Sequence, residues 1–344
     1  MQAVVIHAAH DLRVEERPEA AVGPRDVKVR VRAGGICGSD LHYFQHGGFG
    51  DIRLREPMIL GHEIAGEVAE IGASVTAARV GDRVAVNPSL PCGHCRFCLL
   101  GQPNQCLDMR FYGSAMRMPH VQGGFRETLV CDESQAVPVP PGLKLSSAAF
   151  AEPLAVCLHA ARQAGPMLGA RVLVTGAGPI GALLVLVARH AGAREVVATD
   201  LLDAPLATVR GVGADHVVNL HADPAGLEPY ARDKGVFDVV LEASGSAAAL
   251  AGALKVARPG ATVVQVGFGG GDATIPLNLA VAKEITLRGT FRFHEEFAWA
   301  VEFIASGAID VTPLLTAVLP LRDAKQAFAL AGNRAEAMKV QLAF

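Results

Sequence analysis

The sequence lacks a surplus of charge of either sign. Its 344 residues carry 31 Lys and Arg against 34 Asp and Glu, which gives a formal net charge of −3 at pH 7. No cluster of basic residues offsets this balance, whereas proteins that bind nucleic acid or anionic membranes usually concentrate positive charge. We therefore expect neither a nucleic-acid partner nor a membrane partner.

The sequence also lacks an apolar run long enough to cross a membrane. Residues 172–188 form the run that comes nearest, but a membrane helix needs about 20 apolar residues, and three glycines and a proline interrupt its first half. It suits a strand, a tight turn and a buried helix. The first ten residues, MQAVVIHAAH, lack a positive segment followed by an apolar one, so we expect no secretory signal.

A disulfide framework is a further feature that the sequence does not offer. The chain has seven cysteines, an odd number, and four of them lie within residues 92–106. Metal ligation in a reducing compartment explains this distribution better than disulfides do, so we expect a cytoplasmic protein. The cysteines are Cys37, Cys92, Cys95, Cys98, Cys106, Cys131 and Cys157.

The pattern of apolar residues divides the chain into two parts. Hydrophobic residues make up 51% and charged residues 19%, enough apolar material for two packed domains. Residues 1–148 contain short alternating segments such as 27–31, 65–71 and 83–86, punctuated by Gly and Pro, which predict a mostly β domain. Residues 149–290 alternate apolar runs with Ala-rich stretches, which predicts βαβ units around a parallel sheet.

The individual elements of the second half follow from the same alternation. We predict strands over 171–175, 195–199, 216–219, 237–242, 262–266 and 285–289. The tail, residues 291–344, is predicted to complete the first domain with helices over 295–306 and 321–331 and a strand over 337–342.

A glycine pattern lies between the first of these strands and the following helix. Gly176, Gly178 and Gly181 form G-x-G-x-x-G, with Pro179 at the start of the helix. In a dinucleotide-binding loop the first glycine permits the tight turn, the second admits the pyrophosphate and the third lets helix and strand pack closely. A generic tight turn is the alternative interpretation, because the pattern alone is common in a chain with 37 glycines.

Asp200 ends the second predicted strand, 24 positions after Gly176. A carboxylate at this place can accept hydrogen bonds from both hydroxyls of an adenine ribose and repels a 2′-phosphate. The sequence therefore predicts NAD rather than NADP, although Asp200 could also serve as a helix cap.

Two sets of candidate zinc ligands differ in their spacing. Cys92, Cys95, Cys98 and Cys106 form C-x2-C-x2-C-x7-C, and four thiolates can close a tetrahedral structural site; buried free thiols or an iron–sulfur cluster are the alternatives. Cys37, His62, Glu63 and Glu152 are dispersed. Because a single Cys or His is more often a core residue than a ligand, chemistry alone leaves the second set undecided.

Several motifs together resemble one family. GICGSDLHY, GHEIAGEV, the four-cysteine loop, AEPLAV and VTGAGPIG stand in the order typical of zinc-containing medium-chain dehydrogenases. AEP stands where many alcohol dehydrogenases have a cysteine, so the chain resembles the sorbitol (polyol) dehydrogenase branch. The blocks NPSLPCGHC, NQCLDMRFYGSAM, PHVQGGF, FAEPLAVCLHAARQAG and FRF are similar to bacterial L-idonate 5-dehydrogenases.

The resemblance implies a GroES-like, mostly β catalytic domain and a Rossmann-type doubly wound cofactor domain. It implies two zinc ions, with Cys37 and His62 binding the catalytic ion, Glu63 as a third ligand and Glu152 as a direct or water-mediated partner. Ser39 would start a proton relay, and Tyr43 and Arg292 would line the substrate pocket. The positions that match dinucleotide contacts are Ile180, Asp200, Val266, Gly267, Phe268, Phe291 and Phe293.

The expected reaction is oxidation of the C5 hydroxyl of L-idonate with NAD. A sugar acid needs a cation for its carboxylate, and Arg110, Arg117, His120 and Arg292 are the candidates, although loop arginines are usually only solvated. The chain departs from the polyol branch at Pro205, where a basic residue can contact the cofactor.

Other functions remain open at this point. A sorbitol or xylitol dehydrogenase would use the same zinc chemistry without an anion site. A non-catalytic zinc- and nucleotide-binding protein, or a zinc-free quinone or enone reductase, is disfavoured by the presence of Cys37, His62 and Glu152. The resemblance further suggests a homotetramer or homodimer.

Overall fold

The computed structural model describes residues 1–269 and 272–344 and divides them into two compact units. The first contains Met1–Ala155, His294–Asn333 and Lys339–Phe344, and the second contains Val156–Phe293 and Arg334–Met338. The units differ from the predicted domains at three points, since the first boundary lies after residue 155 rather than 148 and the second after residue 293 rather than 290. Helix α4 (Ala151–Ala164) continues across the first boundary, and a short piece of the tail joins the second unit.

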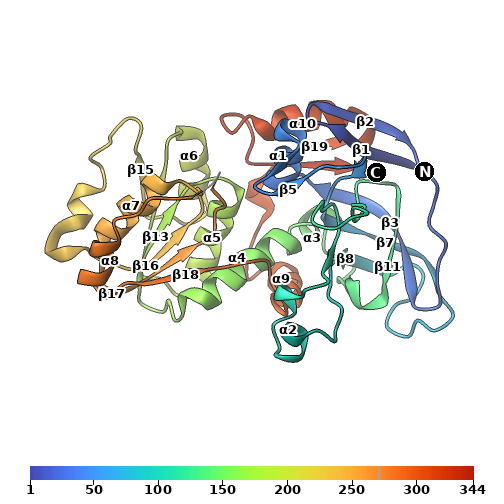
Figure 1. Ribbon diagram of the computed structural model, residues 1–344, viewed down its shortest axis with the longest axis horizontal. Helices are drawn as coiled ribbons and strands as arrows, with labels where there is room; N and C mark the ends of the chain where they lie inside the picture. The colour runs from blue at the N-terminus through green and yellow to red at the C-terminus, as the bar shows by residue number, and fades with distance from the viewer. Residues whose placement is uncertain (270–271) are drawn as a thin grey trace. The chain divides into compact units, whose positions relative to one another are not determined.

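A seven-stranded sheet organises the first unit (Figure 1). Its strand order is β12-β8-β7-β3-β20-β19, with β11 paired to β3. The bounds are β3 (Asp26–Gly35), β7 (Glu63–Ile71), β8 (Arg83–Val86), β11 (Thr128–Asp132), β12 (Ala136–Pro138), β19 (Leu315–Pro320) and β20 (Lys339–Ala343).

Alternating burial explains the central strands of this sheet. Val27, Val29 and Val31 on β3 are fully buried, while residues between them are more exposed. This period of two places one face against the core. The three short segments predicted from alternation fall within β3, β7 and β8. β20 pairs with β3, so the tail contributes to this sheet as expected.

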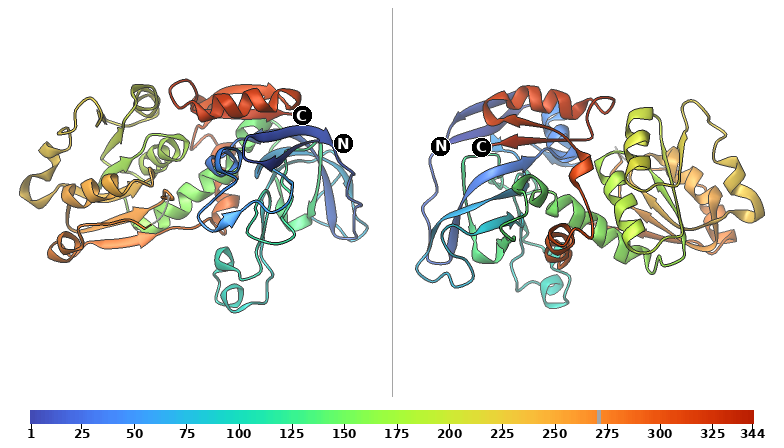
Figure 2. Two further views of the ribbon diagram at one scale, coloured as in Figure 1. Left: turned by 45° about the horizontal axis from the view of Figure 1, so that its top comes forward. Right: turned by 180° about the vertical axis from the view of Figure 1, so that it is seen from behind.

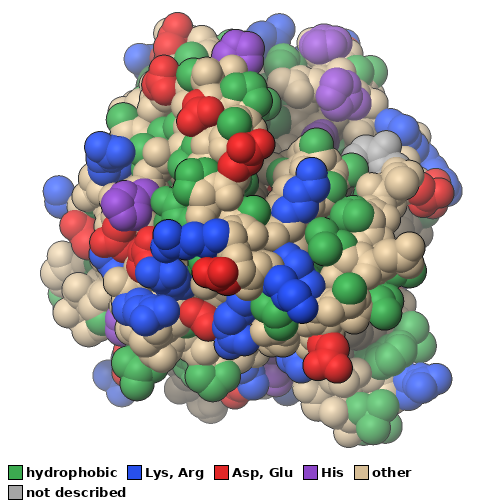
Figure 3. All heavy atoms as spheres, turned by 90° about the vertical axis from the view of Figure 1, so that its left-hand side faces the viewer, with side chains coloured by type: hydrophobic (Ala, Val, Ile, Leu, Met, Phe, Trp, Pro, Cys, Tyr) green, Lys and Arg blue, Asp and Glu red, His purple; other side chains and the backbone are tan. Residues whose placement is uncertain are grey.

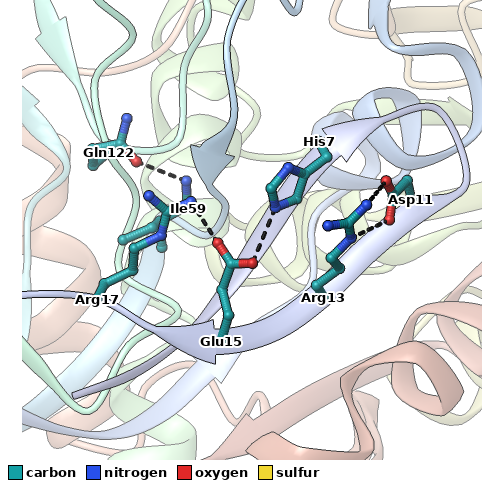
Figure 4. A network of polar contacts seen from close by, with 7 residues as sticks. All are labelled: His7, Asp11, Arg13, Glu15, Arg17, Ile59 and Gln122. Atoms are coloured by element: carbon teal, nitrogen blue, oxygen red, sulfur yellow. Dashed lines mark hydrogen bonds and ion pairs between the residues drawn. The ribbon is translucent and has the colours of Figure 1, made fainter.

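A separate three-stranded sheet carries the N-terminus. It joins β1 (Gln2–Ala8), β2 (Asp11–Glu16) and β6 (Met58–Ile59). Figure 4 shows its polar contacts: His7 and Arg17 both bind the Glu15 carboxylate, and Arg13 binds Asp11 through two nitrogens. Partly exposed ion pairs of this kind contribute little stability each, about 0–1 kcal/mol.

Short elements connect the sheets of the first unit. Its helices are α1 (Gly38–His46), α2 (Arg96–Leu99), α3 (Leu145–Ala148), α9 (Glu296–Ala305) and α10 (Ala324–Gly332). Its small strand pairs are β4 (Gly48–Phe49) with β5 (Ile52–Arg53) and β9 (Ser89–Leu90) with β10 (Arg110–Phe111). The predicted helix 321–331 is wrong in its first turn, where Leu321–Asp323 is a 3-10 turn.

The second unit is a six-stranded parallel sheet with helices on both faces (Figure 1, Figure 2). The strand order is β15-β14-β13-β16-β17-β18. The strands are β13 (Arg171–Thr175), β14 (Glu195–Asp200), β15 (His216–Asn219), β16 (Phe237–Glu242), β17 (Ala257–Gln265) and β18 (Thr286–Gly289), and the helices are α5 (Pro179–His190), α6 (Asp203–Gly211), α7 (Ala247–Val256) and α8 (Leu277–Ala282).

This sheet confirms the predicted doubly wound fold. The order reverses between β13 and β16, and ligands of such sheets bind at the carboxyl ends of the strands near this reversal. Strands 171–175, 216–219 and 237–242 match their predicted bounds. β17 begins five residues before the predicted 262–266 and ends one residue earlier. Its extra residues begin with Ala257, which pairs with Phe237, and the register shifts before Thr262 pairs with Val239.

Among the described residues, no helix has the length and apolarity to cross a membrane. On the face of the molecule in Figure 3, Lys and Arg side chains lie interspersed with Asp and Glu. No charge of a single sign dominates that face.

Candidate active site

Three side chains predicted as ligands converge in the first unit. Cys37 precedes α1, while His62 and Glu63 lie at the start of β7, and one ligand atom from each lies within 4.8 Å of the other two. His62 is 4% and Glu63 1% exposed. A thiol, an imidazole and a carboxylate are the ligand types that zinc prefers, and three protein ligands leave a position open.

Two buried charges that the sequence analysis did not single out flank this set. Asp40 accepts hydrogen bonds from the backbone N–H groups of Cys37 and Gly61, and its Oδ1 lies 3.8 Å from His62 Nδ1. Lys339 Nζ lies 2.5 Å from Glu63 Oε1 and also donates to the Ile36 carbonyl. Asp40 thus anchors the cysteine, and Lys339 orients the glutamate.

The electrostatics of the set favour a cation. Burial opposes the charged form of His62, but the charges of Asp40 and Cys37 outweigh it and raise the pKa of this imidazole well above its usual value. Burial raises the pKa of Asp40. The negative charges that favour a proton on His62 would also favour a divalent cation in place of that proton.

Unsatisfied buried atoms support the same conclusion. Glu63 Oε2 is buried and has no hydrogen-bond partner, whereas His62 Nδ1, which also has none, faces Asp40 Oδ1 at 3.8 Å. A Cβ at Gly35 would lie 1.9 Å from Glu63 Oε2, so only glycine leaves room for this carboxylate. Buried polar atoms normally have partners, and a metal ion would supply one to Glu63 Oε2. These residues therefore fit a zinc ion.

Glu152 lies in the same buried charge cluster but outside the group of three. It is 5% exposed and stands in the first turn of α4. Burial raises its pKa to about 7, with His62 acting to lower it and Glu63 to raise it. The structure thus places Glu63, rather than Glu152, within ligand distance of both Cys37 and His62.

The two remaining predicted residues of α1 occupy different environments. Ser39 is half-buried in the first turn, two positions after Cys37. Tyr43 is 1% exposed, and its hydroxyl accepts a hydrogen bond from the Ala115 backbone at 2.9 Å. Tyr43 therefore positions the segment around Ala115.

The four cysteines of residues 92–106 form a second cluster. Their four sulfur atoms lie within 4.8 Å of one another. Backbone N–H groups point at the sulfurs, for example from Cys92 to Cys106 at 3.2 Å and from Cys95 to Cys92 at 3.3 Å. Such N–H groups lower the pKa of Cys95 to about 6. Four sulfurs that lie this close together, with backbone N–H groups directed at them, fit a closed structural zinc site.

The glycine loop of the second unit has the conformation that a dinucleotide site requires. Gly176 has φ +85°, which favours glycine. A Cβ at Gly181 would lie 1.8 Å from the Gly176 carbonyl oxygen, so α5 can approach β13 only with glycine there. Gly178 is the N-cap of α5 and Pro179 is its first residue, which leaves backbone N–H groups available for a phosphate.

Other predicted cofactor residues surround the carboxyl ends of the strands. A Cβ at Gly267 would lie 2.3 Å from the Gly245 nitrogen, which explains a glycine after Val266. Phe268 is 71% exposed and meets the Phe291 ring edge-on at 6.2 Å, a prominent apolar surface. Two members of the predicted set are less accessible: Ile180 is half-buried and Phe293 is 1% exposed.

The sequence suggested that the Asp200 carboxylate could accept hydrogen bonds from an adenine ribose. In the structure this carboxylate already has other donors. Its Oδ2 accepts from the Ala177 backbone and from Arg334, and its Oδ1 accepts from the Leu201 and Leu202 backbone. Arg334 belongs to the short tail segment of this unit and was not anticipated.

Three of the four residues predicted to bind the substrate carboxylate either have other partners or point away from His62. Arg117 is ion-paired with Asp108. His120 Nε2 accepts from the Arg55 N–H, so its Nδ1–H donates to the Arg117 carbonyl and no ring donor remains. Phe111 on β10 packs on the His62 ring, and successive strand side chains point to opposite faces, so Arg110 points away from His62.

Arg292 is the remaining candidate. It has φ +55°, an uncommon backbone conformation for a residue with a side chain, and its guanidinium lies 4.7 Å from the Phe291 ring centroid. The strained backbone and the ring contact both fix the position of this cation.

The chain belongs to the zinc-binding dehydrogenases. Residues 23–141 match the alcohol dehydrogenase GroES-like domain, and residues 179–306 match the zinc-binding dehydrogenase domain. The predicted GroES-like and Rossmann-type architecture is therefore confirmed.

Within this family, named relatives point to the polyol dehydrogenase branch. L-idonate 5-dehydrogenase (NAD(P)+) of Escherichia coli K12 is 45% identical over 92% of this chain and 91% of its own length. Sorbitol dehydrogenase of Gallus gallus is 36% identical over 99% and 95%. The crystal structure of the Escherichia coli L-idonate 5-dehydrogenase superposes with a TM-score of 0.96 at 42% identity and covers 100% of this chain and 98% of that one.

Proposed function

We propose that this protein is a zinc-dependent dehydrogenase that oxidises the C5 hydroxyl of L-idonate to 5-keto-D-gluconate, with NAD as the hydride acceptor. The observation that carries the proposal is the Cys37–His62–Glu63 group in a chain that is 45% identical to an L-idonate 5-dehydrogenase. The presence of this group also argues against a non-catalytic protein and against a zinc-free reductase.

Cys37, His62 and Glu63 would hold the catalytic zinc, with Glu152 available as a further partner, and the four-cysteine cluster would hold a second, structural zinc. When bound, the catalytic zinc supplies Lewis acidity toward the substrate hydroxyl and NAD supplies the hydride acceptor. Asp40 fixes the backbone of Cys37 and balances charge on His62. Lys339 holds one oxygen of Glu63, which leaves the other for the metal.

Ser39 would move the proton that the substrate hydroxyl loses. It stands in the first turn of α1, two residues after Cys37, and is half-buried. The cofactor would occupy the glycine loop Gly176–Gly181, with its pyrophosphate at the start of α5 and its adenine ribose toward Asp200.

A kinetic comparison tests the substrate assignment. We expect kcat/KM with NAD to be higher for L-idonate than for sorbitol or xylitol, because the polyols lack the carboxylate that a cation would bind. If sorbitol or xylitol were the better substrate, the polyol dehydrogenase interpretation would replace this one.

Arg292 is our proposed partner for the substrate carboxylate. A guanidinium can bind a carboxylate through two parallel hydrogen bonds, which are roughly twice as strong as neutral ones. Arg292→Ala should therefore reduce kcat/KM for L-idonate about 10- to 100-fold and affect sorbitol less. Arg110→Ala and Arg117→Ala are matched controls that remove the same charge. An equal loss for both substrates with Arg292→Ala would assign this residue a role other than anion binding.

We further propose that the protein is a cytoplasmic homodimer or homotetramer. Seven cysteines without a disulfide among the described residues suit a reducing compartment. Strand β18 lies at an edge of the parallel sheet and all four of its residues are exposed, which supports association with a second copy.

A further inference from the structure

The carboxylate of Asp200 is fully engaged. Its Oδ2 accepts from Ala177 N–H at 2.7 Å and from Arg334 Nη2 at 2.5 Å, and its Oδ1 accepts from Leu201 N–H at 2.7 Å and Leu202 N–H at 3.2 Å. A carboxylate offers about four acceptor sites. A ribose hydroxyl can therefore bind Asp200 only if it displaces or shares one of these donors.

Only one of the four donors can move without distorting the fold. Three are backbone N–H groups of the glycine loop and of the segment that follows β14. The fourth is the guanidinium of Arg334, whose side chain is 50% exposed while that of Asp200 is 3% exposed. Arg334 is thus the donor that an entering cofactor would rearrange.

The same guanidinium lies beside the phosphate-binding turn. A Cβ at Gly178, the N-cap of α5, would lie 3.9 Å from both Nε and Nη2 of Arg334. Arg334 therefore stands between the carboxylate that would face the adenine ribose and the helix N-terminus that would face the pyrophosphate. Both neighbours belong to the same compact unit as Arg334.

The Arg334 guanidinium changes the charge that an adenine ribose would meet at Asp200. Asp200 alone would repel a 2′-phosphate and favour NAD. Paired with Arg334, its charge is neutralised. A guanidinium displaced from the carboxylate can in turn bind a phosphate through two hydrogen bonds.

We propose that Arg334 is a specificity-determining residue of the cofactor site, which admits NADP by binding its 2′-phosphate and competes with the ribose of NAD for Asp200. This inference rests on the proposed dehydrogenase function. It departs from the prediction, drawn from Asp200 alone, that NADP is excluded.

Binding of cofactor fragments tests the inference without turnover. Calorimetric titration of the full-length, zinc-loaded protein would compare ADP-ribose with 2′-phospho-ADP-ribose. We expect Arg334→Ala to weaken 2′-phospho-ADP-ribose about 10- to 100-fold and to leave ADP-ribose unchanged or bound more tightly. Arg334→Lys should lie between, because it keeps the charge but not the paired hydrogen bonds.

Three further variants complete the design. Asp200→Ala should strengthen 2′-phospho-ADP-ribose, and adding Arg334→Ala should remove that gain. Arg232→Ala removes an exposed arginine of the same unit and should change neither ligand.

Each contrary result has a distinct meaning. An equal loss for both ligands in Arg334→Ala would assign the arginine to the shared pyrophosphate and overturn the inference, and so would no change for either. If the unaltered protein bound neither fragment, the proposed dehydrogenase function would itself fail.

Discussion

At the scale of single residues, Asp40 and Lys339 control the candidate zinc ligands without belonging to them. Asp40 is fully buried, holds the Cys37 N–H and lies 3.8 Å from His62 Nδ1. Lys339 is 3% exposed and binds Glu63. Groups behind metal ligands fix their orientation and raise their basicity.

Asp40→Asn should therefore weaken zinc binding at the catalytic site. The variant removes the negative charge beside His62, and its amide can replace only one of the two acceptor oxygens. Loss of such a partner typically costs about 10–100-fold in metal affinity. Competition with a chelator measures this affinity, and Asp11→Asn at the start of β2 is the matched control. Equal zinc affinity in Asp40→Asn and the unaltered protein would show that Asp40 does not support zinc binding.

The residues that the sequence analysis missed share a physical reason. Lys339 lies 276 positions from Glu63, and Arg334 lies 134 positions from Asp200. Only the tertiary fold brings such pairs together, so the spacing of residues in the sequence does not predict them. Asp40 had a local signal, because Cys37-x-x-Asp40 forms a capping box at the start of α1.

At the scale of elements, the four-cysteine segment is a small lobe with little core of its own. Leu99, Leu100 and Leu107 within it are 65–75% exposed, and no residue of α2 is buried. Hydrophobic packing therefore cannot hold this lobe, and metal-coupled folding would supply its stability.

Cys95→Ser should lose one zinc ion per chain and unfold at a lower temperature. In a domain of this size each kcal/mol lowers Tm by about 2–4 °C, so we expect a drop of several degrees. Metal analysis and calorimetry measure both effects. Cys37→Ser should lose the other zinc, and Cys131→Ala should lose neither. Unchanged melting of Cys95→Ser would contradict the structural role.

Elements with a regular pattern were predicted most accurately. The strands at 171–175, 216–219 and 237–242 match because apolar, β-rich runs end at clear turns. The ligand group Cys37–His62–Glu63 needed the family resemblance, since the spacing of dispersed residues does not determine a site. The pairing of Arg117 and the engagement of His120 were not visible in the sequence at all.

At the scale of the whole molecule, β18 is an exposed edge of the parallel sheet that carries Leu287, and exposed apolar residues of α8 precede it in the chain. Leu277, Val281 and Leu287 are 62%, 69% and 43% exposed. An edge strand with exposed apolar side chains offers both backbone groups and apolar area to another strand. Pairing of two copies along β18 would extend the parallel sheet across them.

Leu287→Lys should therefore shift the protein toward a monomer. A charge at this edge opposes strand pairing and leaves the interior of the sheet unchanged. Light scattering during size-exclusion chromatography measures the mass. Leu168→Lys places the same charge on another exposed leucine of this unit and should leave the mass unaltered. A monomeric unaltered protein would refute association through β18.

The most direct test of the proposed function follows the transferred hydrogen. L-idonate that carries deuterium at C5 would be oxidised with NAD by the zinc-loaded protein. We expect 5-keto-D-gluconate as the product and deuterium at C4 of the nicotinamide, detected by mass spectrometry and NMR. Unlabelled NADH would place oxidation at another carbon, and no turnover of L-idonate beside rapid turnover of sorbitol would contradict the sugar-acid assignment altogether.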